Sequence, residues 1–122
     1  MINAILASKP NTEIILQTTN PAWDSPSGSN ASGTLRPNLA DFYQAYRDVA
    51  KERRLLLVDH FPNWLKLQQQ NPTEFQAAVP DGVHPTSAAW TKYVIPLLKW
   101  KLSGGQPLPL IRRRGLNSSD PR

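Results

Sequence analysis

The fold of this 122-residue chain is decided by the stretch Glu13-Ile14-Ile15-Leu16-Gln17-Thr18-Thr19. This is a short apolar run rich in β-branched residues, bounded by the turn-forming pairs Pro10-Asn11 and Asn20-Pro21, and it predicts a strand. Its apolar residues occupy consecutive positions, which favours a strand buried on both faces, as in a parallel sheet.

A helix and a second strand follow in the chain. Between Asn38 and Arg54 the apolar residues recur at the three-and-four spacing of one helical face. Leu55-Leu56-Leu57-Val58-Asp59 then has the composition of another buried strand. Residues 13–59 therefore predict a strand, helix, strand unit of the α/β class.

The other segments are predicted from turn residues and periodicity. Residues 2–8 look like the end of a helix, and residues 20–37 hold enough Pro, Gly, Ser and Asn for a long loop. We expect a short helix over 62–70, a loop over 71–80, and a final helix over 86–102 that begins at Thr86 and kinks at Pro96.

The stretch Asp81-Gly82-Val83-His84-Pro85-Thr86 carries the clearest chemical signal. A carboxylate three residues before an imidazole, with glycine between them, lets Asp81 accept a hydrogen bond from the Nδ1 side of His84. Nε2 of His84 is then free to take a proton from a nucleophile. The structural alternative is a pair that caps a helix or closes a turn.

With Ala88, Ala89 and Trp90 following before an apolar helix, this stretch resembles the last sequence block of the SGNH (GDSL-type) hydrolases, a family of serine esterases and lipases. The resemblance implies a three-layer α/β/α sandwich with a parallel sheet, the flavodoxin-like SGNH fold. It also implies that Asp81 and His84 are the acid and base of a catalytic triad.

The resemblance covers residues 1–102 as the C-terminal portion of such a domain. It places the nucleophilic serine block, and the glycine and asparagine blocks of the oxyanion hole, upstream of the given residues. Two predicted strands are also too few for a stable parallel sheet, so the sequence looks incomplete.

The loop of residues 20–37 leaves the carboxyl end of the first strand, where open parallel sheets bind ligands. Trp23 is therefore a candidate substrate-binding residue, and the alternative is a tryptophan that packs the loop onto the body. Asn20 and Asp24 cannot be ranked. No serine of the loop has a Gly-Asp-Ser or Gly-x-Ser-x-Gly context, so we interpret Ser25, Ser27, Ser29 and Ser32 as loop residues.

His60 is the only other histidine. Side chains of adjacent strand residues point to opposite faces, so Asp59 and His60 should not meet, and a structural role is expected for His60. A metal site of Asp59, His60, Asp81 and His84 has no supporting ligand spacing, and the chain has no cysteine. The sequence predicts neither a metal nor a cofactor.

The net charge of +5 is concentrated at one end of the chain. Residues 1–98 carry eight Lys or Arg and eight Asp or Glu, whereas residues 99–122 carry six basic residues and one acid. Residues 103–122 read as a flexible basic tail, and no aromatic residue lies among its arginines for stacking on bases, so nucleic-acid binding is not expected. No stretch is long enough to span a membrane, a signal peptide fits poorly, and no compartment is assigned.

These features predict a serine-type ester hydrolase that acts on a small acyl or acetyl ester, with carbohydrate esters among the possible substrates. The given residues alone should be inactive and should self-associate through an uncovered sheet edge. The alternative is a non-catalytic remnant or interaction module of the same fold, and a nucleic-acid binder with a basic tail is a third reading.

Overall fold

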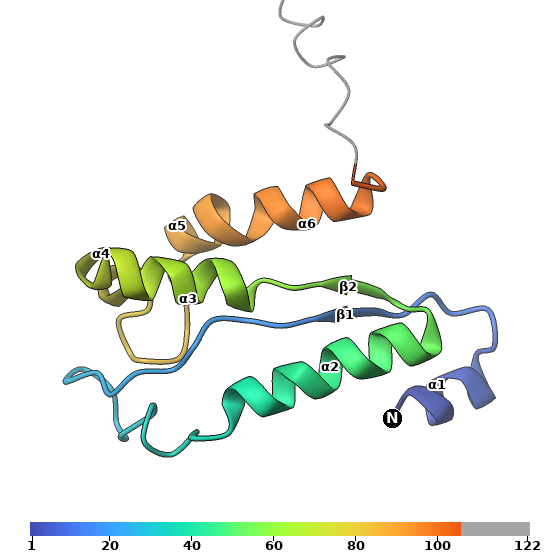
Figure 1. The fold of residues 1–122 in the computed structure, drawn as a ribbon, viewed down its shortest axis with the longest axis horizontal. Helices are drawn as coiled ribbons and strands as arrows, with labels where there is room; N and C mark the ends of the chain where they lie inside the picture. The colour runs from blue at the N-terminus through green and yellow to red at the C-terminus, as the bar shows by residue number, and fades with distance from the viewer. Residues whose placement is uncertain (106–122) are drawn as a thin grey trace, which may run out of the picture.

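The computed structural model describes residues 1–105 and contains helices and one two-stranded parallel sheet. Strand β1 (Ile15–Gln17) pairs with β2 (Leu56–Val58), and α2 (Leu39–Arg53) connects them along the chain. Figure 1 shows the strands side by side in the middle of the molecule, with helices on either side. The predicted strand, helix, strand unit and the mixed α/β class are confirmed, although each strand is shorter than predicted.

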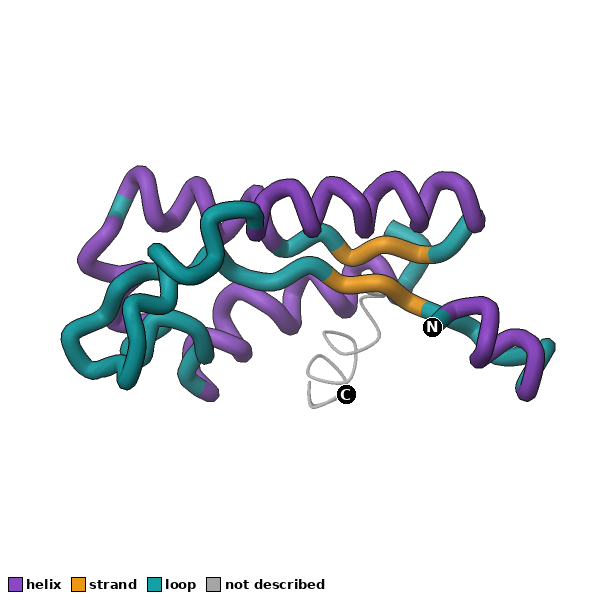
Figure 2. The backbone as a smooth tube through the Cα atoms, turned by 90° about the horizontal axis from the view of Figure 1, so that it is seen from below, coloured by secondary structure: helices purple, strands orange, loops and turns teal. Residues whose placement is uncertain are grey.

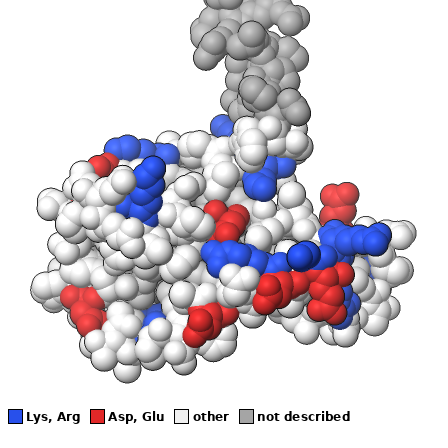
Figure 3. Space-filling view, in the orientation of Figure 1, with Lys and Arg blue, Asp and Glu red and all other residues white. Residues whose placement is uncertain are grey.

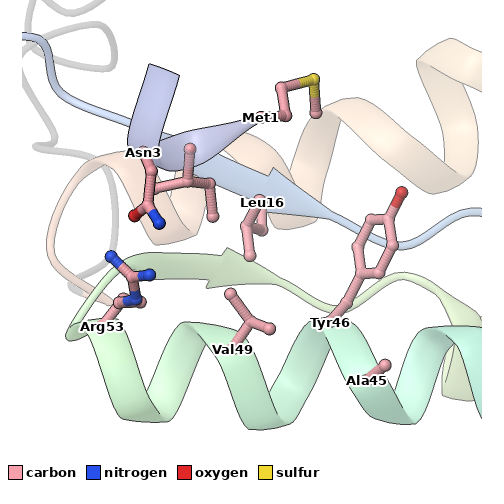
Figure 4. Close-up of a pocket in the computed structure, with 8 residues that line it drawn as sticks. Met1, Asn3, Leu16, Ala45, Tyr46, Val49 and Arg53 are labelled. Atoms are coloured by element: carbon pink, nitrogen blue, oxygen red, sulfur yellow. The ribbon is translucent and has the colours of Figure 1, made fainter. Parts of the chain in front are cut away.

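Helix α2 packs against both strands through one face. Tyr43 and Ala50 are its buried residues, and Arg54 ends it in the left-handed conformation with a φ of 54°. Leu16 of β1 and Val49 of α2 point toward each other in Figure 4. They line an apolar cavity of about 370 Å³ between α1 (Ile2–Ser8), β1 and α2, so side chains do not fill this face.

Two consecutive helices follow β2, namely α3 (Phe61–Gln70) and α4 (Pro72–Ala78). The expected short helix is α3, but the expected loop over 71–80 is wrong. Asn71 caps α4 by accepting a hydrogen bond from Glu74 N at 3.1 Å, and its own Nδ2 donates to Glu74 Oε2 at 2.9 Å. Proline at the first helical position has no N–H, and the Asn71 cap satisfies one of the free N–H groups that a helix start exposes, that of Glu74.

The final helical segment changes its helix type just before Pro96, where a kink is predicted. It consists of α5 (Ser87–Ala89), a π-helical turn η1 (Trp90–Val94) and α6 (Ile95–Leu102), and Thr86 Oγ1 caps it by accepting from Ala89 N at 3.1 Å. Proline has no N–H for the preceding turn and its ring crowds the carbonyl four residues back. The wider turn directly before Pro96 accommodates this defect.

The hydrophobic core lies between α3, α4, the loop that joins α4 to α5, and the helical segment after this loop. Its buried members come from α3, α4, the loop, α5 and η1, and Trp23 packs against them from the loop of residues 20–37. The ring of Trp64 lies 6.2 Å from that of Phe75 and 5.1 Å from that of Tyr93. The buried residues of this cluster are Trp64, Phe75, Ala78, Val79, Ala89 and Val94.

The loop of residues 20–37 and the loop that joins α4 to α5 both lie at the carboxyl end of the strands, at the left of Figure 1. Figure 2 shows the same loops gathered at one end of the molecule, away from α1 and the chain start. The strand pair itself is incompletely covered, because Ile15 and Leu56 are 39% and 38% exposed. Two strands form the sheet within residues 1–105, so the predicted three-layer sandwich is larger than what is described.

Candidate active site

The loop between α4 and α5 has a tight turn at Gly82. Its φ is +88°, and a Cβ built on it would lie 2.2 Å from the backbone oxygen of Trp23. Glycine is required here for two reasons, the backbone conformation and the close approach of a second segment. The turn brings the side chains of Asp81 and His84 together.

The Asp81 carboxylate binds His84 through both of its oxygens. Oδ1 accepts from the backbone N–H groups of Val83 at 2.9 Å and His84 at 2.7 Å, and Oδ2 lies 2.6 Å from Nδ1 of the His84 ring. An ionised carboxylate can only accept, so Nδ1 carries the proton and Nε2 is left as the acceptor. This is the pairing predicted from the sequence.

These hydrogen bonds also set the charge of the carboxyl group. The backbone N–H of His84, then its ring, then the N–H of Val83 hold the pKa of Asp81 far below its usual range. Asp81 is therefore ionised at neutral pH. It can stabilise an imidazolium when His84 Nε2 takes up a proton.

The pair lies at the protein surface. The His84 side chain is 81% exposed and that of Asp81 is 44% exposed. The histidine is held on its Nδ1 side, and the rest of its ring faces solvent in the part of the chain that the structure describes. A nucleophile can approach Nε2 from outside this chain segment.

Trp23 is anchored to the same loop. Its indole Nε1 donates to the backbone oxygen of Val79 at 2.7 Å, its backbone N donates to that of Gly82 at 3.0 Å, and its ring packs against the core. These contacts favour the alternative in which Trp23 packs the loop onto the body. Its role in substrate binding stays a prediction.

The loop serines are used in other contacts. Ser25 Oγ donates to the backbone oxygen of Pro80, and Ser32 Oγ donates to that of Asn30 at 3.4 Å. Both residues are buried. This agrees with their interpretation as loop residues.

Sequence reasoning missed the roles of Asn20 and Asp24. Asn20 is 3% exposed and donates from Nδ2 to the backbone oxygen of Val83 at 2.9 Å. Asp24 accepts from Gly33 N at 2.7 Å and Thr34 N at 2.9 Å, which closes the loop of residues 24–34. The Thr34 side chain, then its backbone N–H, lowers the pKa of Asp24.

His60 and Asp59 have separate partners, as adjacent residues should. His60 is 2% exposed, and its Nε2 lies 3.2 Å from Oε1 of Gln17. Burial lowers the pKa of His60, which favours the neutral ring. Asp59 instead forms an ion pair with Arg47 at 2.7 Å and accepts from Thr18 Oγ1 at 2.7 Å.

His60 also lines a second cavity, of about 220 Å³, between β1 and η1. Its Nδ1 is buried without a hydrogen-bond partner among the described residues. The other lining residues are Gln17, Thr18, Thr19, Trp90 and Val94.

Three other kinds of site concern the described residues, namely a metal centre, a membrane span and a nucleic-acid surface. Within residues 1–105, no three His, Cys, Asp or Glu side chains come together in a way that could hold a metal ion. No helix in this range is long and apolar enough to cross a bilayer. On the face drawn in Figure 3, basic side chains lie among acidic ones, so that face has no single-sign surface of the kind that binds nucleic acid. The predicted basic tail lies outside the described residues from residue 106 onward.

No protein-family model matches the chain, and searches of curated proteins and of solved structures found no similar protein. The candidate site therefore depends on its own geometry. The resemblance of residues 81–90 to a hydrolase block stays a prediction.

Proposed function

We propose that this chain is the C-terminal portion of a serine-type ester hydrolase of the SGNH class, in which His84 is the base and Asp81 orients it. One observation carries the proposal, the contact of 2.6 Å between Asp81 Oδ2 and His84 Nδ1. It leaves Nε2 as an acceptor beside open solvent. A metal or redox cofactor has no role in the proposed reaction.

The pair supplies the proton transfers of acyl transfer. Nε2 takes the proton from a serine hydroxyl as its oxygen attacks the ester carbonyl, and the carbonyl oxygen gains the negative charge. The imidazolium, stabilised by Asp81, then gives that proton to the departing alcohol. In the second half, His84 takes a proton from water, which attacks the acyl-enzyme, and returns it to the serine as the acid is released.

The nucleophile and the oxyanion donors are proposed to come from residues upstream of the given ones. The sheet supports this, because parallel strands are normally buried on both faces and β1 and β2 are not. The apolar cavity between α1, β1 and α2 in Figure 4 is a second surface for an additional layer. The complete domain would then be the three-layer α/β/α sandwich, with further parallel strands beside β1.

The substrate class is proposed to be a small acyl or acetyl ester. The test is hydrolysis of a short-chain aryl ester by the given residues alone and joined to an upstream segment with the serine block. We expect no rate above buffer for the first and turnover for the second. Hydrolysis by the given residues alone would show that the proposed division of the site is wrong.

A non-catalytic interaction module of the same fold is the second candidate. The 81% exposure of the His84 side chain supports it equally, because an open ring can meet a partner protein as well as a nucleophile. The two candidates differ in one outcome of the experiment above. A joined protein that folds but turns over no ester would support the module.

A further inference from the structure

Residues 20–28 hold the backbone of the His84 loop from Val79 to Val83. The carbonyl oxygens of consecutive loop residues meet partners from this one segment, and it directly follows β1. The hydrogen bonds are Trp23 Nε1 to Val79 O, Ser25 Oγ to Pro80 O, Trp23 N to Gly82 O, and Asn20 Nδ2 to Val83 O.

The remaining carbonyl, that of Asp81, is enclosed by the same segment. A Cβ built on Gly28 would lie 2.6 Å from Asp81 O. A Cβ on Gly82 would meet Trp23 O in the same way, at 2.2 Å. The two backbones therefore approach more closely than residues with side chains allow.

Asn20 has a special place in this contact, because it acts on the peptide unit that joins Val83 to His84. The oxygen of that peptide accepts from Asn20 Nδ2 at 2.9 Å. Its N–H, which belongs to His84, donates to Asp81 Oδ1 at 2.7 Å. One peptide plane is thus held from both sides, and rotation of the plane would break both bonds.

The environment of Asn20 makes this hold rigid. The residue is 3% exposed, its Nδ2 also donates to Pro21 O at 3.0 Å, and its Oδ1 accepts from Thr19 Oγ1 at 2.8 Å. Both hydrogens of its amide nitrogen are donated, its amide oxygen accepts one hydrogen bond, and its backbone continues from β1. Asn20 therefore links the position of the strand to the orientation of the histidine.

We propose that Asn20 is a positioning residue for His84, and that it acts on the Val83–His84 peptide without touching the reacting atoms. This inference rests on the proposed function for its catalytic meaning. Its physical content, the tautomer and orientation of the His84 ring, can be measured without any activity. Without the Asn20 bond the peptide turns, and the His84 ring loses its alignment with Asp81 Oδ2.

The test is two-bond ¹H–¹⁵N spectroscopy of the histidine rings in the full 122-residue chain, which shows the ring nitrogen that carries the proton. We expect His84 to be protonated at Nδ1 when neutral. Asn20→Asp keeps the shape of the side chain and removes both donated hydrogen bonds, to Pro21 O and to Val83 O. Loss of the bond to Val83 O should change the tautomer ratio roughly fivefold toward Nε2–H, the effect of one lost hydrogen bond. Thr34→Ala removes a contact elsewhere in the same loop and should leave the ratio unchanged.

A second variant covers the case in which Asn20→Asp does not fold. Ser25→Ala removes the hydroxyl that donates to Pro80 O, one residue before Asp81, and that accepts from Ser27 N at 3.2 Å, and it should move the ratio in the same direction by a smaller amount. Unchanged ratios in variants that keep the wild-type circular dichroism spectrum would overturn the proposal.

Activity separates this inference from the proposed function. In a joined hydrolase, Asn20→Asp should lower kcat roughly fivefold to tenfold with little change in KM, because the substrate is not contacted. A shifted tautomer ratio in a joined protein without turnover would sustain the positioning role and reject the hydrolase. A joined protein that turns over ester, and whose Asn20→Asp variant keeps the wild-type kcat and tautomer ratio, would support the hydrolase and reject the positioning role.

Discussion

Replacement of Gly82 by alanine tests the contact between the two loops. The glycine has a φ of +88°, and the new Cβ would lie 2.2 Å from Trp23 O. A left-handed backbone costs a residue with a Cβ roughly 1–2 kcal/mol. The clash also separates Trp23 N from Gly82 O, and that hydrogen bond contributes about 1 kcal/mol.

The expected loss for Gly82→Ala is therefore about 2–3 kcal/mol of the free energy of unfolding. Urea denaturation followed by tryptophan fluorescence measures it. Gly104→Ala is the matched control, because Gly104 has a φ of +73° and no atom within 4 Å of a built Cβ. It should lose only the backbone term, roughly 1–2 kcal/mol. Equal losses in the two variants would refute the close approach of the loops.

Three further predictions concern the end of α2, the charge of Asp81 and the edge of the sheet. Arg54→Gly should raise the free energy of unfolding by about 0.5–1 kcal/mol, because Arg54 ends α2 at a positive φ; Arg53→Gly, inside the helix, should lower it in the same melt. The pKa of Asp81 is lower in the folded state than its ordinary value of 3.8, so the ionised carboxylate stabilises the fold fully above about pH 5 and less as the pH falls through 3.8 and below. In acid melts, Asp81→Asn should lack this pH-dependent loss of stability, and an unchanged acid limb would contradict the prediction. Ile15→Lys should reduce self-association in sedimentation velocity, because a charge on an exposed edge strand opposes pairing, whereas Thr12→Lys, outside the strand, should not.

Much of the fold could be predicted because its signals are local. The apolar runs at 13–19 and 55–59 and the periodicity of 38–54 predict the parallel pair and its connecting helix. Helix α4 was missed although Asn71, Pro72 and Glu74 form a recognisable helix start. Helix α4 has too few apolar residues to show helical periodicity, so the capping residues at its start are the only sequence signal for it.

The candidate site also has a local part that the sequence predicts and a long-range part that it does not. Asp81 and His84 are three residues apart, so their pairing follows from the turn at Gly82. Asn20 lies 63 residues from its partner Val83, and a polar residue in a loop carries no periodic signal. Contacts of that separation are set by the tertiary arrangement, and the same is true of Trp23.

The proposed role of His84 as the base of an ester hydrolase can be measured directly. The most direct measurement is kcat for a short-chain aryl ester in the protein that joins these residues to the upstream serine block, with and without His84→Ala. We expect the substitution to lower kcat by several orders of magnitude while the fold is retained, as loss of a triad base does. A His84→Ala protein that keeps kcat within about tenfold of the wild type would contradict the assignment of this loop.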